Sequence, residues 1–157
     1  LCLDWLSAQN LKDKVVIDYG CGSGVLGVAA LLLGAKEVLA VDIDPQAILA
    51  TRQNAALNNV SDRLKVFLPE EFSEYQRAHE LKADTITANI LAKPLIEFAP
   101  LFSTLLKDGG SIVLAGLIEN QTQSVIDAYT PYFELDSAYH YDNKDDHHWH
   151  RLSGIKK

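Results

Sequence analysis

The sequence predicts an α/β fold, in which a mostly parallel sheet carries helices on both of its faces. Short apolar runs alternate with longer helical patterns along the chain, as the strand–helix–strand units of a parallel sheet require. A glycine-rich turn at 20–24 follows the apolar run 15–17 and precedes small apolar residues, which is typical of a strand, a tight turn and a helix. With 157 residues, 48% of them hydrophobic, the chain can form one domain with a sizeable core.

The elements follow one another in order from the N-terminus, where residues 1–6 have the apolar face of a helix. The predicted strands are the apolar runs 14–19, 37–42, 63–68, 84–89 and 111–116. The predicted helices are 24–33, 45–57, 94–106 and 119–129. Helix 45–57 has the clearest beginning, because Asp44 suits the N-cap and Pro45 the first helical position, where its missing N–H costs nothing.

The C-terminal part of the chain departs from this alternation. Strand-like stretches near 132–140 and 147–155 are separated only by the polar stretch 141–146, so they predict an antiparallel hairpin. The segment 69–83 is polar, and we assign no element to it.

Composition and charge exclude several classes of function. The formal net charge of −7 disfavours binding to a nucleic-acid backbone. The sequence contains no apolar run of about 18 residues, so we expect no membrane span, and we expect no signal peptide. Its two cysteines, Cys2 and Cys21, lack metal-type spacing, which predicts a reduced, cytoplasmic protein. Because the chain lacks methionine and opens on a helical face, we expect a fragment of a longer protein, and we expect it to be monomeric.

The glycine turn is the first part of a predicted ligand site, because ligands of open parallel sheets bind beyond the carboxyl ends of the strands. Its three glycines, Gly20, Gly22 and Gly24, allow a sharp bend and let a ligand lie against the backbone. Asp18, two residues earlier, would repel a phosphate and suits a positively charged ligand. Its carboxylate could take up the positive end of that ligand, or it could hold the loop by accepting backbone N–H groups.

The ends of the second and fourth strands complete the predicted site. Asp42 lies 18 residues beyond the last loop glycine, where a carboxylate can accept hydrogen bonds from both hydroxyls of a ribose. Asp44 competes for this role but is already needed as an N-cap. Asn89 offers both a donor and an acceptor and should lie at the mouth of the pocket. The alternative for Asn89 is a capping role at the next helix.

Other motifs leave alternatives open. A GxGxxG pattern at 22–27 keeps a nicotinamide-dependent oxidoreductase possible, although Gly27 could simply allow close packing of a helix on a strand. Of the three histidines at 147, 148 and 150, only two would share one face of a strand, so we expect no metal site. Cys21 has no evident base beside it, which argues against a nucleophilic role.

The segment from Asp18 to Gly24, together with Asp42 and Asn89, resembles the class I S-adenosylmethionine-dependent methyltransferases. The runs VIDYGCGSGVLGVAA, VDIDPQAI, NAALNNV, ANILAKPL and the ending WHRLSG are similar to the PrmA family, which methylates large-subunit ribosomal protein eleven. The resemblance implies a Rossmann-like, seven-stranded sheet with one antiparallel strand. It also implies S-adenosylmethionine as cofactor, bound through Gly20, Asp42 and Asn89, with Asp18, Gly22 and Gly24 in the same pocket.

The resemblance further implies that residues 1–157 form the S-adenosylmethionine-binding domain of a protein N-methyltransferase acting on lysine and N-terminal amines of that ribosomal protein. The family's N-terminal recognition domain and a threonine-containing cofactor segment are not in this sequence. A lysine must lose its proton before it can accept a methyl group, so we expect the Asn89 side-chain oxygen to orient a neutral amine, with solvent taking the proton. The residues after Asn89, Ile90-Leu91-Ala92, offer no aromatic plane for a flipped base, which favours a protein substrate. A small molecule or another protein remains the alternative substrate.

Overall fold

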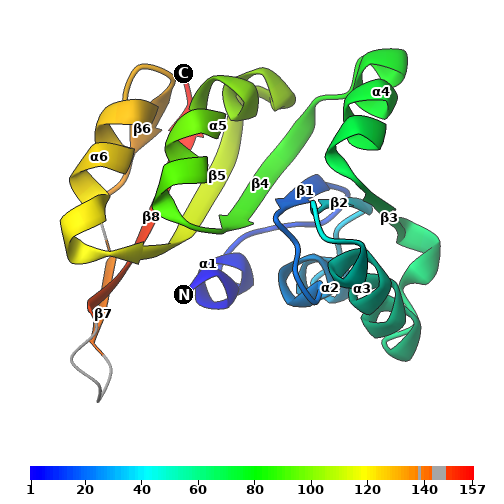
Figure 1. The fold of residues 1–157 in the computed structure, drawn as a ribbon. Coiled ribbons are helices and arrows are strands. Elements are labelled where there is room, and N and C mark those ends of the chain that lie inside the picture. Colours follow the sequence, from blue (N-terminus) through cyan, green and yellow to red (C-terminus); the bar gives the residue numbers. More distant parts are fainter. Residues whose placement is uncertain (138, 143–147) are drawn as a thin grey trace.

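The computed structural model describes residues 1–137, 139–142 and 148–157, and it shows a single mixed sheet between two layers of helices (Figure 1). The strands are β1 (Val15–Tyr19), β2 (Glu37–Val41), β3 (Leu64–Phe67), β4 (Ala83–Asn89), β5 (Leu106–Ile118), β6 (Phe133–Leu135), β7 (Tyr139–Asp142) and β8 (His148–Lys156). The α-helices are α1 (Cys2–Ser7), α2 (Val25–Leu32), α3 (Pro45–Leu57), α4 (Pro69–His79), α5 (Ala92–Leu105) and α6 (Glu119–Tyr129). A short 3₁₀ turn, Ser61–Arg63, leads into β3.

The sheet has the strand order β3-β2-β1-β4-β5-β8-β6, and β7 pairs with β8 beside this path. The strands β1 to β5 are mutually parallel, whereas β8 runs antiparallel to β5, β6 and β7. The order reverses at β1, which pairs with β2 on one side and β4 on the other, and ligands of such sheets bind at this reversal. The predicted mostly parallel sheet with antiparallel C-terminal strands is therefore confirmed.

Successive side chains of each strand point to opposite faces of the sheet, so the hydrophobic core is divided between these two faces. Val16 of β1 and Val38 of β2 pack with α1, α2 and α3, whereas Ile17 and Leu39 pack on the opposite face with α4, α5 and α6. All four of these side chains are buried, as expected for strands covered on both faces. None of the helices in the described part of the chain has the length and apolar character needed to cross a membrane.

Two segments differ from the sequence-based expectations. The polar segment 69–83 contains α4, whose few apolar side chains, Phe72 and Tyr75, face the core while its other residues are mostly polar. The stretch 132–140 is divided into β6 and β7, both paired with β8, so the predicted hairpin is formed by β7 and β8 alone. The remaining strands and helices lie within a few residues of their predicted bounds, except that β5 extends from 106 to 118.

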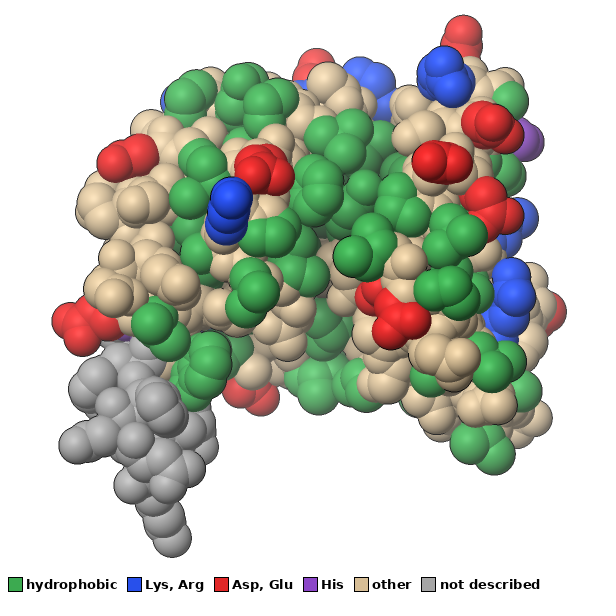
Figure 2. All heavy atoms as spheres, in the orientation of Figure 1, with side chains coloured by type: hydrophobic (Ala, Val, Ile, Leu, Met, Phe, Trp, Pro, Cys, Tyr) green, Lys and Arg blue, Asp and Glu red, His purple; other side chains and the backbone are tan. Residues whose placement is uncertain are grey.

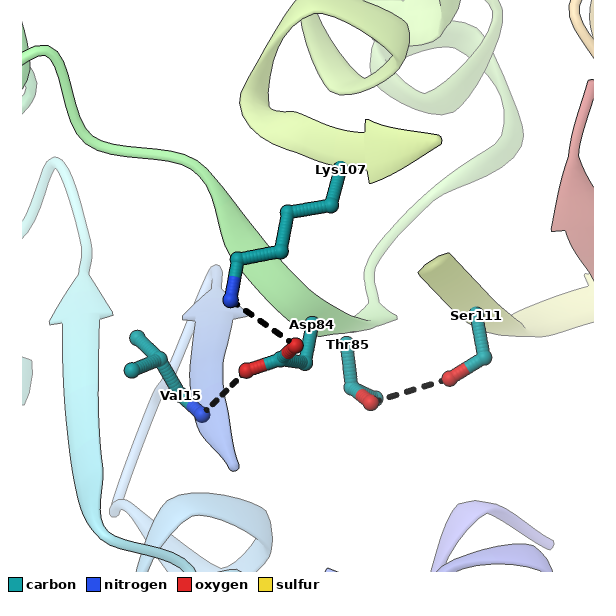
Figure 3. Close-up of polar contacts among 5 residues, drawn as sticks. All are labelled: Val15, Asp84, Thr85, Lys107 and Ser111. Carbon is teal, nitrogen blue, oxygen red and sulfur yellow. Dashed lines mark hydrogen bonds and ion pairs between the residues drawn. The ribbon is translucent and has the colours of Figure 1, made fainter. Parts of the chain in front are cut away.

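A polar cluster joins the amino ends of three central strands, on the edge of the sheet opposite the predicted site (Figure 3). The Asp84 carboxylate accepts the Val15 backbone N–H at 2.9 Å and pairs with the Lys107 ammonium at 3.0 Å. The Thr85 and Ser111 hydroxyls are hydrogen-bonded at 2.9 Å beside it. The cluster ties β1, β4 and β5 together, and so it helps to fix the register that brings their carboxyl ends to one edge.

Candidate ligand site at the carboxyl edge of the sheet

The glycine loop leaves β1 through backbone conformations that favour glycine. Gly20, Gly22 and Gly24 have φ values of +80°, +55° and +86°. The backbone N–H groups of Gly20 and Cys21 donate to the Val41 carbonyl at 2.7 and 3.0 Å, which anchors the loop to the end of β2. These conformations confirm the predicted tight turn. They also explain why glycines occupy it, because residues with a Cβ rarely adopt such φ values.

Asp42 follows β2 directly and reaches across to the glycine loop. Its carboxylate accepts the Gly22 N–H at 2.9 Å and the Asp44 N–H at 3.0 Å. Asp44 itself accepts the Gln46 N–H at 2.9 Å and caps α3, as predicted from the sequence. Asp42 is half-buried, and an ionised carboxylate has further lone pairs free to accept from a ligand. Asp42, unlike Asp44, is hydrogen-bonded to the glycine loop itself, and its contact with a ribose stays a prediction.

Helix α3 supports the loop through two side chains that the sequence analysis did not single out. The Thr51 hydroxyl donates to the Gly22 carbonyl at 3.0 Å, and the Asn54 amide donates to the Ser23 carbonyl at 2.7 Å. A Cβ at Gly24 would come within 2.8 Å of the Thr51 methyl group, so this glycine also permits the close approach of α3. The sequence contains a pattern that could have identified these two residues: they lie three positions apart on one helix, which places both side chains on the same face.

Asp18 is buried beneath the loop, with 1% of its surface exposed. Its carboxylate accepts the Gly27 N–H at 3.1 Å and the Thr87 hydroxyl at 3.0 Å, from α2 and β4 respectively. Burial raises the pKa of Asp18 to about 6; these two hydrogen bonds act in the opposite direction, and the nearby Asp42 adds to the rise. Of the two roles considered for Asp18, the structure shows the one that holds the backbone, and direct contact with a ligand stays a prediction.

Asn89 ends β4, and its side chain is exposed at the same edge. The N-cap of α5 is Leu91, so Asn89 does not cap the next helix. Ile90 lies directly against the glycine loop, because a Cβ at Gly20 would collide with the Ile90 side chain. Gly20 is therefore required for close packing as well as for its backbone conformation, and Ile90 joins the end of β4 to the loop.

The structure brings together the glycine loop, Asp42 and Asn89, which come from three neighbouring strands. A Cβ at Gly22 would meet nothing within 4 Å, so open space borders the loop where a ligand would lie on it. The half-buried Asp42 carboxylate faces the same loop. A nucleoside with a positively charged substituent fits this set, because its ribose can meet Asp42 while no lysine or arginine among these residues repels the charge. The residues present fit S-adenosylmethionine in this respect.

The structure gives packing explanations for the GxGxxG pattern at 22–27 and for Cys21. A Cβ at Gly27 would lie 3.1 Å from Val38 and 3.3 Å from an Asp18 oxygen, so Gly27 allows α2 to pack on the sheet, as the non-dinucleotide interpretation expects. Cys21 is buried, and its Sγ lies 3.3 Å from the Thr51 hydroxyl oxygen. Burial raises the pKa of Cys21 to about 11, which keeps it a neutral thiol at physiological pH.

The histidines at 147, 148 and 150, where we expect no metal site, fall partly outside the described residues, since His147 and the side chain of His148 are not described. His150 is buried, and its Nδ1 is 2.7 Å from the Thr122 hydroxyl. Within the residues that the structure describes, no group of three or more His, Cys, Asp and Glu could hold a metal ion.

Known proteins are similar to this chain in sequence and in fold. The family model described as "Ribosomal protein L11 methyltransferase (PrmA)" matches residues 1–157. A curated ribosomal protein L11 methyltransferase from Psychrobacter sp. (strain PRwf-1) is 61% identical over 98% of this chain and 52% of its own length. The chain therefore spans about half the length of the curated relatives that it matches.

Two solved structures show the fold. A ribosomal protein L11 methylase from Lactobacillus delbrueckii subsp. bulgaricus has a TM-score of 0.82 at 29% identity, over 99% of this chain and 77% of its own. An O-methyltransferase from Bacillus cereus in complex with SAH has a TM-score of 0.75 at 12% identity, over 99% of this chain and 79% of its own. The expected Rossmann-like class I methyltransferase fold is confirmed, and the chain belongs to the ribosomal protein L11 methyltransferase (PrmA) family.

Proposed function

We propose that residues 1–157 form a methyltransferase domain that binds S-adenosylmethionine and methylates amino groups of ribosomal protein L11, on lysine side chains and at the N-terminus. The observation that carries the proposal is the meeting of the glycine loop, Asp42 and Asn89 at one edge of the sheet in a member of this family. The Bacillus cereus fold neighbour was solved with SAH, the product that S-adenosylmethionine leaves after methyl transfer, which supports the choice of cofactor.

The cofactor would be held by backbone and carboxylate groups. Asp42 would accept hydrogen bonds from the ribose hydroxyls, and the backbone of Gly20, Gly22 and Gly24 would allow close approach. The Asp18 carboxylate lies below the loop and adds negative potential without needing to touch the ligand. These assignments rest on the geometry of the loop and on the resemblance of its residues to class I methyltransferases.

The bound cofactor supplies a methyl group that is already activated by a positively charged sulfur, so the protein mainly has to position the acceptor. Asn89 would accept a hydrogen bond from the neutral acceptor amine through its side-chain oxygen and so orient the amine. The nitrogen lone pair then faces the methyl group. We assign the proton to solvent, since the residues that line this edge in the described structure include no histidine or glutamate placed to act as a base.

The surface beside the site supports a protein substrate. Figure 2 shows hydrophobic side chains gathering over α5 and between α5 and α4. Leu91, at the N-cap of α5, and Ile96 and Leu101, within α5, have 73%, 36% and 38% of their surface exposed. Exposed apolar side chains at this density suit a protein surface better than a phosphate backbone. We accordingly propose that the domain acts on protein and does not bind nucleic acid directly; a monomeric state and a cytoplasmic location stay proposals made from the sequence.

Two measurements test the proposal. Calorimetry of the chain with S-adenosylmethionine, SAH and NAD should show binding of the first two alone, and binding of NAD alone would favour an oxidoreductase. Radiolabelled methyl transfer to purified ribosomal protein L11 should then be followed with the chain and with the complete product of its gene. We expect transfer by the complete product and much less by residues 1–157 alone. Transfer that is undiminished in the Asn89→Ala variant would contradict the role given to Asn89, and transfer to small amines only would contradict the protein substrate.

A further inference from the structure

The strand β5 contains a bulge beside Asn89. Leu114 pairs with Leu152 of β8, and Leu117 pairs with His150. Two residues of β5, Ala115 and Gly116, therefore lie opposite one residue of β8, which defines a β-bulge. Bulges of this kind bend a strand locally and redirect side chains, and they recur next to active sites.

Gly116 occupies this bulge with a φ of +87°, a conformation that favours glycine. A Cβ at this position would lie 2.5 Å from the Ile90 carbonyl oxygen and 3.1 Å from Asn89 Oδ1. The backbone of Gly116 is thus in close contact with the end of β4. Any larger residue would have to displace either the Ile90 backbone or the Asn89 carboxamide.

A pocket of about 330 Å³ opens at the same place. It is lined by Leu1, Cys2, Asn89, Ala115, Gly116 and Trp149. Its lining combines polar and apolar surface in similar amounts, and Asn89 supplies a polar side chain. Among these lining residues there is no carboxylate to pair with an ammonium, whereas the Asn89 oxygen can accept a hydrogen bond from a neutral amine and the apolar side chains can contact an aliphatic stem.

We propose that the bulge at Ala115–Gly116 forms the acceptor pocket of this domain and that Gly116 is the positioning residue that fixes the Asn89 carboxamide at its mouth. The inference deepens the proposed methyltransferase function and rests on it. The ligand class is a primary amine on an unbranched aliphatic chain, as in a lysine side chain. Gly116 acts through Asn89: its missing side chain lets Asn89 Oδ1 lie against β5, where it can meet the amine.

The chain provides a matched control for the obvious variant. Gly109 also lies in β5 and has a φ of +77°, but a Cβ there would meet nothing within 4 Å. Gly116→Ala and Gly109→Ala therefore impose a similar backbone strain. They differ in the contact with Asn89 and Ile90, so the difference between the two variants isolates the positioning role.

Three readouts separate positioning from general damage. In ¹⁵N NMR spectra, the side-chain amide signal of Asn89, assigned by its loss in Asn89→Asp, should move in Gly116→Ala and stay in place in Gly109→Ala. Calorimetric Kd values for S-adenosylmethionine should agree within about threefold between Gly109→Ala and the unmodified chain, and Gly116→Ala should change the Kd by less than it changes methyl transfer. Methyl transfer to ribosomal protein L11 in the complete gene product should fall about 10- to 100-fold in Gly116→Ala alone, because displacement by a fraction of an ångström spoils the alignment of the amine.

An unmoved Asn89 signal, or equal losses of transfer in the two glycine variants, would overturn the inference. If Gly116→Ala does not fold, the variant Ala115→Val can be used instead, because it keeps the glycine and narrows the pocket. Ala115→Val should raise the KM for ribosomal protein L11 without changing the Kd for the cofactor. An unchanged KM would also overturn the inference. Failure of the unmodified complete protein to bind S-adenosylmethionine or to transfer methyl groups would instead refute the proposed function.

Discussion

Replacing Asp18 with asparagine should stabilise the fold at neutral pH and weaken cofactor binding. Asparagine has the shape of aspartate and can keep both contacts: its oxygen can accept the Gly27 N–H, and its NH₂ group can donate to the Thr87 hydroxyl. The substitution removes only the charge, which lies in a site with 1% exposure. It therefore measures what burial of that charge costs the native state.

The magnitude follows from the pKa of Asp18, which burial raises from 3.8 to about 6. At about 1.36 kcal/mol per pKa unit, the ionised carboxylate costs the native state about 3 kcal/mol. The sign is set by linkage: between pH 4 and pH 6 the native state binds a proton that the unfolded state does not, so this contribution to stability is lost as the pH rises. The free energy of unfolding of Asp18→Asn should exceed that of the unmodified protein by up to about 3 kcal/mol at pH 7. The two values should be equal near pH 4.

Urea unfolding followed by circular dichroism between pH 4 and pH 7.5 measures this difference, and equal m-values would show that the unfolded states are comparable. Calorimetry at pH 7 should show weaker S-adenosylmethionine binding by the more stable variant, because the negative charge below the loop is gone. A stability difference that does not change with pH, or a variant less stable than the parent at pH 7, would refute the reasoning.

Three further substitutions test other parts of the site and fold. Asp42→Ala should weaken S-adenosylmethionine binding by about 10- to 100-fold in calorimetry, since hydrogen bonds to a charged group contribute about 1.5–3 kcal/mol; an unchanged Kd would exclude Asp42 from the ribose site. For Asp84, burial raises the pKa, but the Val15 N–H and Lys107 outweigh it and the net pKa is lowered, so its contribution to stability is present at neutral pH and lost in acid. Asp84→Asn should lower the free energy of unfolding by about 1 kcal/mol at pH 7 and by less near pH 3, the opposite pH trend to Asp18→Asn. Cys21→Ala should retain methyl transfer in the radiolabel assay, because the Cys21 thiol, with a pKa of about 11, is neutral; abolished transfer with an intact fold would show that the thiol takes part.

Local patterns made most of the elements predictable. The cap of α3 needs only Asp44 and Pro45, and the glycine loop needs only its own glycines, so both follow from neighbouring residues. Helix α4 was missed because its core contacts depend on few apolar residues in a polar segment, too sparse a pattern to show a helical period. The division of β6 from β7 was missed because each strand is short and is defined by its pairing with β8.

In the candidate site, too, some features could be predicted from the local sequence and others depend on contacts between distant residues. Asp42 and Asn89 could be proposed from the sequence because each follows a recognisable strand, and parallel strands end at one edge. The contacts of Asp18 could not, since Thr87 is 69 residues away and its hydroxyl is brought to Asp18 by the pairing of β1 with β4. The role proposed for Gly116 likewise depends on a bulge that exists only in the register between β5 and β8.

The sequence by itself determined the alternation of strands and helices, the loop conformation and the charge at the end of β2, because these depend on side-chain periodicity and on residues near one another in the chain. Only the tertiary structure decided which groups share a buried environment: the raised pKa of Asp18, the support of the loop by Thr51, and the contact of Gly116 with Asn89. The physical reason is that desolvation and close packing depend on all neighbours in space, and strand register places those neighbours.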